Sequence, residues 1–322
     1  MINKRNPNLS IIVSFRNEAD VLDEFIERVQ NSLDPLTCTY EMLFVNDAST
    51  DASIDILRQK AEKDTRIKVI SMSRRFGQAE CVFAGFEKST GDRVIYMDAD
   101  LQDPPEIIPE LIRTLDEEKA DVVYTTRLSR SGESAGKLMI TRWAYRMIHT
   151  LSSVDIPVDS GDFKLLSRQV VDHLVEFKEQ GLYIRGLISW LGFKQVPFFY
   201  HREPRFSGKS KFPIWKSKGP FLSFVRAILS FSLFPIYSVL FCGLFLFLLS
   251  LCVLLGTMGM NLLYDVCIPS WGYIILSITS MGGLELLAVG MVGLYIGHIH
   301  QNSLARPRYI IESTINLNET HE

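Results

Sequence analysis

Short apolar runs alternate with amphipathic runs over residues 9–125, and this alternation limits the folds open to the chain. The spacing predicts a strand over residues 9–15, followed by a helix over residues 19–32 whose apolar side chains share one face. Strands and helices then continue in turn over residues 42–45, 53–63, 67–72, 78–88, 93–97, 105–117 and 122–125. This order favours an α/β fold with a mixed, mainly parallel sheet and helices on both of its faces.

Two long stretches in the second half carry almost no charge. No charged residue occurs over residues 227–264, and Glu285 is the only one over residues 266–297. Each stretch can hold the ~20 apolar residues that a bilayer core requires, so we expect two transmembrane helices, near residues 233–256 and 271–296. Lys and Arg flank the pair but are missing from its connecting loop, which predicts that both chain ends are cytoplasmic. We interpret Glu285 as a hydrogen-bonding group between helices of an oligomer.

Several protein classes are disfavoured by the composition. The net charge of −3 argues against a nucleic-acid-binding protein. The five cysteines have no paired spacing and imply neither disulfides nor a zinc site. The absence of GxxxxGK[ST] and GxGxxG patterns argues against a Walker ATPase and against a dinucleotide oxidoreductase.

The predicted strand over residues 93–97 ends in two acids, Asp98 and Asp100. In extended backbone, side chains two residues apart leave on the same side, so the two carboxylates can share one cation. Hard carboxylate oxygens suit Mg²⁺ or Mn²⁺. The alternative is an acidic turn that caps the helix beginning at Pro104 and Pro105.

Polar residues also follow the other predicted strands, at residues 15–18, 46–51 and 73–78. Ligands of such sheets bind beyond the carboxyl ends of the strands. Asp47 can accept a hydrogen bond from a base or ribose, and Arg75 can meet a phosphate. Each also has a plainer interpretation: residues 47–51, which include Asp47, suit a turn and helix cap, and Arg75 suits a solvated edge. Together they indicate a nucleotide-diphosphate site.

The regular alternation ends after residue 125. Residues 127–137 form a basic, glycine-containing segment that suits a mobile lid, and a helix is expected over residues 138–151. In residues 159–165, acids flank Gly161; an acid there can act as a base or electrostatic partner, or the segment is a turn before a helix over residues 167–177. The cations of residues 202–212 can meet lipid headgroups or substrate phosphates. An amphipathic interface helix is expected over residues 212–231.

Five motifs in order resemble the membrane-bound polyprenyl-phosphate glycosyltransferases of inverting family 2, which have a GT-A (Rossmann-like) fold. These enzymes are related to dolichyl-phosphate mannose synthase and bacterial undecaprenyl-phosphate glucosyltransferases. The motifs are D-A-D-L-Q-x-P-P-E at residues 98–106, S-R-x-F-G-Q at 73–78, D-x-G-D-F-[RK]-L at 159–165, R-x-x-G-x-S-K-[YF] at 205–212, and Y-I-G with R-P-x-Y at 295–297 and 306–309. The likeness covers nearly the whole chain, although Arg74-Arg75 stands where Arg-Asn is common.

The resemblance implies a role for each group of site residues. Asp98, Asp100 and Gln102 would hold Mg²⁺ or Mn²⁺, and Asp162 and Asp100 would be catalytic. The nucleotide would be bound by Phe15, Asn17, Glu18, Asp47, Arg75, Gln78, Asp98 and Ala99. Donor or acceptor phosphates would be bound by Arg127, Arg130, Lys137, Arg202, Arg205, Ser207, Lys209 and Ser210.

The implied reaction is transfer of a sugar from a nucleotide sugar to undecaprenyl phosphate, for modification of a cell-envelope glycan. UDP-glucose is the first candidate donor. A homotetramer in the cytoplasmic (inner) membrane is also implied. We expect a cytoplasmic GT-A domain over residues 1–205, a basic loop and interface helix over 206–232, the transmembrane pair over 233–297 and a cytoplasmic tail over 298–322.

Two alternatives stay open. One is a processive polysaccharide synthase, which normally has a Q-x-x-R-W motif and more membrane helices than this chain. The other is a non-catalytic membrane scaffold that keeps a nucleotide-sugar-binding fold; the acids Asp98, Asp100 and Asp162 argue against it.

Overall fold

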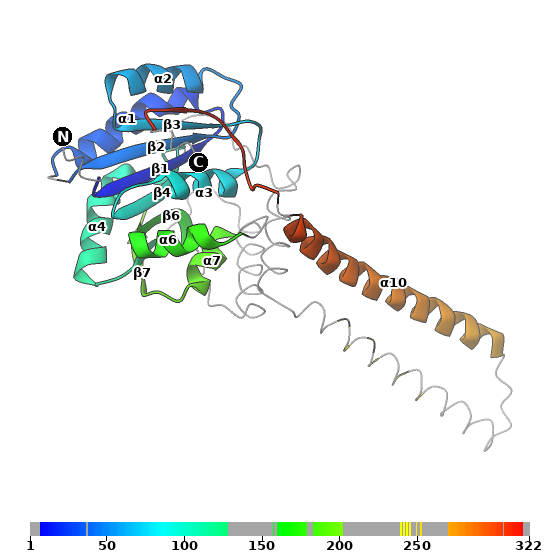
Figure 1. Cartoon of the computed structure of the whole chain (residues 1–322). Helices are drawn as coiled ribbons and strands as arrows, with labels where there is room; N and C mark the ends of the chain where they lie inside the picture. Colours follow the sequence, from blue (N-terminus) through cyan, green and yellow to red (C-terminus); the bar gives the residue numbers. More distant parts are fainter. Residues whose placement is uncertain are drawn as a thin grey trace. The chain divides into compact units, whose positions relative to one another are not determined.

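The computed structural model describes residues 7–36, 38–127, 157, 160–178, 183–201, 270–304 and 306–317, and positions 239, 241, 243, 245, 249 and 252. The chain divides into two compact units (Figure 1). Unit 1 comprises Met1–Ala227 and Arg306–Glu322, and unit 2 comprises Ile228–Ala305.

Unit 1 begins with the predicted alternation of strands and helices. Its first elements are β1 (Leu9–Phe15), α1 (Ala19–Leu33), β2 (Tyr40–Asn46), α2 (Ser53–Lys63), β3 (Ile67–Met72), α3 (Gln78–Lys88), β4 (Arg93–Asp98), the 3-10 turn η1 (Pro105–Ile107), α4 (Ile108–Glu117) and β5 (Val122–Arg127). Further along the chain come β6 (Ser160–Ser167), α6 (Arg168–Glu176), α7 (Ile184–Trp190), β7 (Gln195–Tyr200) and β8 (Ile311–Ile315). The elements predicted up to residue 125 are therefore confirmed.

The strands form one mixed sheet in the order β7-β5-β6-β4-β1-β2-β3-β8. The pairs β4–β1, β1–β2 and β2–β3 are parallel, and β5 is parallel to β7. Strand β6 runs antiparallel between β4 and β5, and β8 runs antiparallel along β3. The interpretation of residues 159–165 as a turn is wrong for the described part, because buried Phe163 and Leu165 anchor residues 160–167 as a strand paired on both sides.

Apolar side chains cover both faces of this sheet. On one face, Val13 of β1 shares a buried cluster with Phe25 of α1, Leu57 of α2 and Leu111 of α4. Helix α3 packs on the opposite face against Ile12, whose side chain leaves the strand on the other side from that of Val13 (Figure 1). The approach is close: a Cβ added to Gly85 of α3 would lie 2.3 Å from Ile12 Cγ2, so this position requires glycine.

A buried carboxylate stabilises the end of the sheet where the parallel strands begin. Glu41 is 2% exposed and accepts hydrogen bonds from Ser10 Oγ (2.6 Å), Thr90 N (2.8 Å) and Lys68 Nζ. Burial alone would raise the pKa of Glu41, but these donors outweigh it and the pKa lies below its ordinary value. The network is remote from the carboxyl ends of the strands, so its role is structural.

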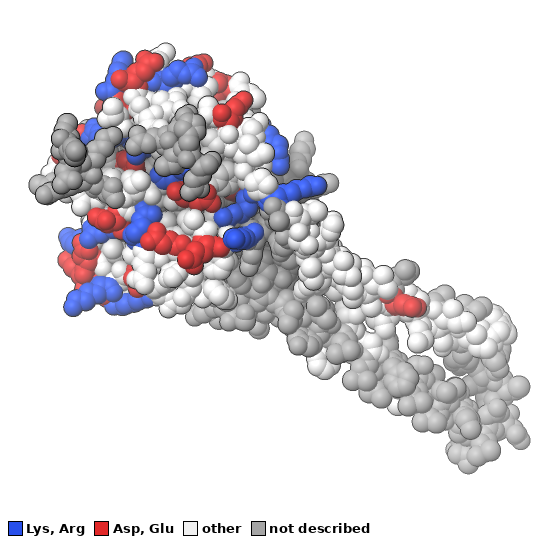
Figure 2. All heavy atoms as spheres, viewed as in Figure 1, with Lys and Arg blue, Asp and Glu red and all other residues white. Residues whose placement is uncertain are grey.

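The described part of unit 2 consists mainly of α10 (Ser270–Ser303), a helix of 34 residues. The helix confirms the helical prediction for the second uncharged stretch. Large apolar side chains are exposed along it, among them Trp271, Ile278 and Val289, and Figure 2 shows its described surface as almost wholly uncharged. Within the described residues, no helix has both the length and the apolar character needed to span a bilayer. The predicted helix over 138–151, the interface helix and most of the first predicted span lie outside the described residues.

Candidate active site

The loops after β1 and β2 are joined at the carboxyl edge of the sheet. Asn17, which has a φ of 54°, donates its backbone N–H to Ser49 Oγ (3.0 Å) and accepts the Thr50 N–H at Oδ1 (2.8 Å). Asp51 accepts the first N–H of α1, from Ala19 (3.2 Å), and the first N–H of α2, from Ser53 (3.1 Å). These bonds lower the pKa of Asp51 although burial opposes them. Asp51 therefore joins the starts of α1 and α2.

Asp47 holds the loop that follows β3. Its side chain lies at the end of β2, and Oδ1 accepts the N–H of Phe76 (2.7 Å) and of Gly77 (3.1 Å). Gly77 has a φ of 113°, which an L side chain would strain. Arg75 lies with Nε 4.0 Å from Asp47 Oδ2 and a side chain 63% exposed, whereas the guanidinium of Arg74 stacks on the Phe76 ring. Arg75 is therefore the arginine of this pair beside Asp47.

Two of the predicted nucleotide contacts have buried side chains. Phe15 is 4% exposed and its ring meets that of Phe44 edge-on, while Ala99 is 2% exposed. Any contact of these residues with a ligand would involve the backbone. Gln78, the first residue of α3, points toward the acids instead: its Nε2 donates to Asp98 Oδ1 at 2.6 Å.

The acid motif has a different backbone from the predicted one. Asp98 is the last residue of β4, but Asp100 lies in a turn, where its Oδ1 accepts the Gln102 N–H at 3.2 Å. Leu101 follows with a φ of 55°. The expectation of two acids on one side of an extended strand is therefore wrong, because the strand ends between them.

The donor atoms of this turn fit a hard cation. In the part of the chain that the structure describes, no group of three or more His, Cys, Asp or Glu side chains is suited to holding a metal ion. Mg²⁺, however, commonly binds through one or two carboxylates together with substrate phosphates and water. Asp98, Asp100 and the amide oxygen of Gln102 offer that kind of ligand set.

The acid loop is also tied to the edge of the sheet. Asp103 is 2% exposed, and the hydroxyl of Tyr200, the last residue of β7, donates to its carboxylate. This contact connects residues 98–103 to the strand that leads into the basic segment beginning at Arg202. Sequence reasoning missed it, since nothing local pairs residues 97 positions apart.

Asp162 of β6 forms a bidentate ion pair with Arg185 of α7. Arg185 Nε donates to Oδ1 at 2.7 Å and Nη2 donates to Oδ2 at 2.6 Å. The register of β6 against β5 shifts between Tyr124 and Thr126, which leaves Asp162 in an irregular part of the strand. Such bulges commonly re-aim side chains beside functional sites.

Two polar side chains are buried next to this pair. Tyr96 of β4 is the register partner of Lys164 of β6, and among the described residues neither the Tyr96 hydroxyl nor Lys164 Nζ has a hydrogen-bond partner. Burial raises the pKa of Tyr96 well above its ordinary value, and the charges of Asp162, Arg185 and Asp98 also act on it. Burial, with Arg185 nearby, lowers the pKa of Lys164 to about 7, although Asp162 opposes the shift.

The remaining predicted residues can be placed only in part. Arg127 ends β5 opposite Tyr200 of β7, and nothing is described of its side chain. Glu18 donates its backbone N–H to Ser53 Oγ at 3.0 Å. The predicted phosphate and acceptor contacts that lie outside the described residues are Arg130, Lys137, Arg202, Arg205, Ser207, Lys209 and Ser210.

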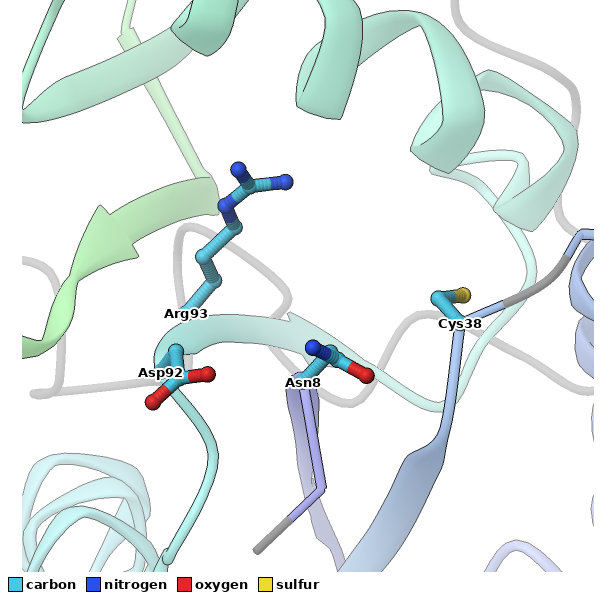
Figure 3. A pocket seen from close by; sticks show the side chains of 4 residues that line it. All are labelled: Asn8, Cys38, Asp92 and Arg93. Carbon is cyan, nitrogen blue, oxygen red and sulfur yellow. The ribbon is translucent and has the colours of Figure 1, made fainter.

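A hollow of about 270 Å³ lies at the opposite edge of the sheet (Figure 3). It is lined by Asn8, Cys38, Asp92 and Arg93, which precede or begin β1, β2 and β4. Burial raises the pKa of the Cys38 thiol, which makes it a poor nucleophile. This hollow is separate from the residues gathered at the carboxyl edge.

Comparison with known proteins identifies the family. A model described as "Glycosyl transferase family 2" matches residues 10–175, which include Asp47, Asp98 and Asp162. The chain belongs to glycosyl transferase family 2. It is 36% identical to the uncharacterized glycosyltransferase YkcC of Bacillus subtilis, over 96% of this chain and 95% of that one.

Two further likenesses have more specific names. This glycosyltransferase is 34% identical to the bactoprenol glucosyl transferase of Shigella phage SfX, over 95% of this chain and 99% of that one. A solved mannosyltransferase from Pyrobaculum calidifontis, in complex with GDP-Man and Mn²⁺, is a weaker match at 16% identity and a TM-score of 0.49, over 94% of this chain and 89% of that one. The family assignment and the first two relatives confirm the resemblance derived from the motifs.

Proposed function

We propose that this glycosyltransferase transfers a sugar from a nucleotide sugar to undecaprenyl phosphate, with UDP-glucose as the first candidate donor. The observation that carries the proposal is that the Asp98 to Gln102 turn ends β4 while Asp162, paired with Arg185, lies on the neighbouring antiparallel strand β6; both acids are two residues from the register partners Tyr96 and Lys164. The bactoprenol glucosyl transferases that match along 95% of the chain support the choice of a polyprenyl phosphate as acceptor.

In the proposed reaction, an acceptor phosphate oxygen forms a bond to the anomeric carbon while the bond to the nucleoside diphosphate breaks. The electron pair leaves with the diphosphate, and attack from the opposite side inverts the configuration. A phosphate monoester, with a second pKa of ~6, is already largely dianionic at neutral pH, so the attack requires no strong base. Asp162, whose carboxylate is oriented by two bonds from Arg185, would align the acceptor or stabilise the oxocarbenium-like state at the reacting sugar.

A divalent cation would neutralise the negative charge that develops on the leaving diphosphate. Asp98, Asp100 and Gln102 would hold it, and Gln78 would orient Asp98 through the hydrogen bond it donates. Arg75, beside Asp47, would add a positive charge for the diphosphate.

We further propose that the protein acts at the cytoplasmic face of the inner membrane, as a homotetramer with two membrane-spanning helices. The two uncharged stretches in the sequence and the exposed apolar side chains of α10 support an apolar surrounding for unit 2. The sugar product would then remain on the lipid as a polyprenyl-phosphate monosaccharide for cell-envelope glycan modification.

The test is transfer of radiolabelled sugar from a panel of nucleotide sugars to undecaprenyl phosphate, by the detergent-solubilised full chain. Label should enter the lipid from one donor, in the presence of Mg²⁺ or Mn²⁺ and not with EDTA. Asp98→Asn should lower the rate by about 10²–10³-fold, because it removes a ligand of the cation that would neutralise the developing charge. The matched control, Asp92→Asn at the opposite edge of the sheet, should leave the rate unchanged.

Failure of every donor to label the lipid, with nucleotide binding retained, would refute the proposal and favour the scaffold. Labelled polymer in place of a lipid-linked monosaccharide would instead favour a processive synthase. Transfer that EDTA does not affect would refute the metal-dependent part alone.

A further inference from the structure

We propose that Arg185 is a positioning residue that holds the Asp162 carboxylate in place beside the acid loop. The inference rests on the proposed function, because it assigns Asp162 to the reacting sugar. Arg185 lies in none of the five motifs, and its role follows from its contacts.

The geometry of the ion pair holds the Asp162 carboxylate in one orientation. The Asp162 and Arg185 side chains are 30% and 21% exposed, so the pair is partly shielded from water. Its two parallel bonds fix both the position and the plane of the carboxylate, which a single bond does not. Ile184 and Leu187 are buried on either side of Arg185, so the backbone that carries the guanidinium is itself anchored in the core.

The charges around Asp162 also favour a permanent cation beside it. Strand β4 ends at Asp98 two residues after Tyr96, and β6 places Asp162 two residues before Lys164, the register partner of Tyr96. When two carboxylates such as Asp98 and Asp162 lie near one another, the state in which both are ionised is disfavoured unless a cation balances their charge. Burial lowers the pKa of Lys164 to about 7, so its charge is incomplete at neutral pH. Arg185 remains charged at every pH at which the protein is folded.

The guanidinium group of Arg185 supplies more than a positive charge. Lysine presents a compact charge on a flexible stem, whereas the planar guanidinium matches a carboxylate with two parallel donors. An arginine here therefore supplies orientation as well as charge. This difference separates a positioning role from a general electrostatic one.

The test compares Arg185→Gln and Arg185→Lys in the sugar-transfer assay with the full chain. Arg185→Gln should lower kcat by about tenfold or more while KM for the donor changes by less than about twofold, because the contact acts in the transition state. Arg185→Lys should recover part of that loss. The matched control is Arg168→Gln, which removes a partly buried arginine that donates to Gly91 O at 2.8 Å at the opposite edge and should leave kcat unchanged.

A second comparison asks whether Arg185 acts through Asp162. In an Asp162→Asn background, Arg185→Gln should cause less than about a twofold further loss, because the contact is already broken. A kcat of the double variant reduced by the product of the two single losses would overturn the inference. So would an unchanged kcat in Arg185→Gln, or an equal loss of kcat in Arg168→Gln.

Melting temperatures of the same variants test the contact without turnover. The two single substitutions should lower the melting temperature by amounts that are not additive in the double variant; additive shifts would overturn the pairing. If the wild-type protein folds but transfers no sugar, while the variants show non-additive shifts in melting temperature, the proposed function is refuted and the contact remains established.

Discussion

Replacing Lys164 by Met is expected to remove a pH dependence from the stability of unit 1. The wild-type lysine is fully buried, and its pKa falls from 10.5 to about 7 in the folded protein. In the unfolded chain it keeps its ordinary value. Between these two values the unfolded state binds more protons than the native state, so the free energy of unfolding rises with pH.

The magnitude follows from the size of the shift. One pH unit corresponds to about 1.4 kcal/mol where the protonation states differ fully. Allowing for half-protonation at the folded pKa, the wild-type protein should gain about 2 kcal/mol between pH 7 and pH 9 relative to Lys164→Met. Below about pH 6 both states are protonated and the difference should be constant. Met keeps the length of the side chain, and removing a buried charge should stabilise the protein at low pH.

The assay is urea unfolding of the detergent-solubilised protein, followed by tryptophan fluorescence at several pH values. Lys194→Met is the matched control, because Lys194 is 54% exposed and its substitution should not change the pH dependence. A constant difference between wild type and Lys164→Met from pH 7 to pH 9 would refute the assignment of Lys164 as a buried amine. So would a difference of the opposite sign.

Two other contacts give predictions for the same assay. Glu41→Gln leaves Lys68 without its carboxylate and should lower the free energy of unfolding by about 2–3 kcal/mol at pH 7. Because the pKa of Glu41 is lowered in the folded protein, this difference from wild type should shrink as the pH falls below the ordinary pKa of 4.5. An equal cost at every pH would contradict the ion pair. Tyr200→Phe removes the hydroxyl that donates to Asp103 and should cost about 1–2 kcal/mol, whereas Tyr96→Phe, whose hydroxyl has no hydrogen-bond partner among the described residues, should cost less than about 0.5 kcal/mol. Equal effects of the two tyrosine substitutions would contradict the Asp103 contact.

The first half of the fold was accessible from the sequence because it is built from local patterns. The apolar positions of residues 19–32 repeat with the period of a helix, and the same side chains are buried in α1. The parallel strands appear as nearly continuous apolar runs, as expected for strands covered on both faces. The candidate site acids stand out for the same reason, since a strand end followed by polar residues is a local signal.

The rest of the fold depends on contacts that no local pattern contains. Strand β6 includes two charged residues, Asp162 and the buried Lys164, so its composition resembles a polar turn, and only pairing with β4 and β5 makes it a strand. Strand β8 pairs with β3 from the far end of the chain. The turn at Asp100 depends on Leu101 at a positive φ, and because no glycine stands there, no local pattern predicts the turn.

The pairing of Asp162 with Arg185 bears on the kind of acceptor that the site favours. A sugar hydroxyl must lose its proton as it attacks, and a transferase acting on one needs a carboxylate that takes up that proton. A carboxylate that accepts two charge-assisted bonds from a guanidinium is a poorer proton acceptor than one without a cation beside it. A phosphate acceptor arrives already ionised and makes no such demand. The bidentate pair is therefore better matched to attack by a phosphate oxygen, and its loss should affect the orientation of the reacting groups more than proton removal.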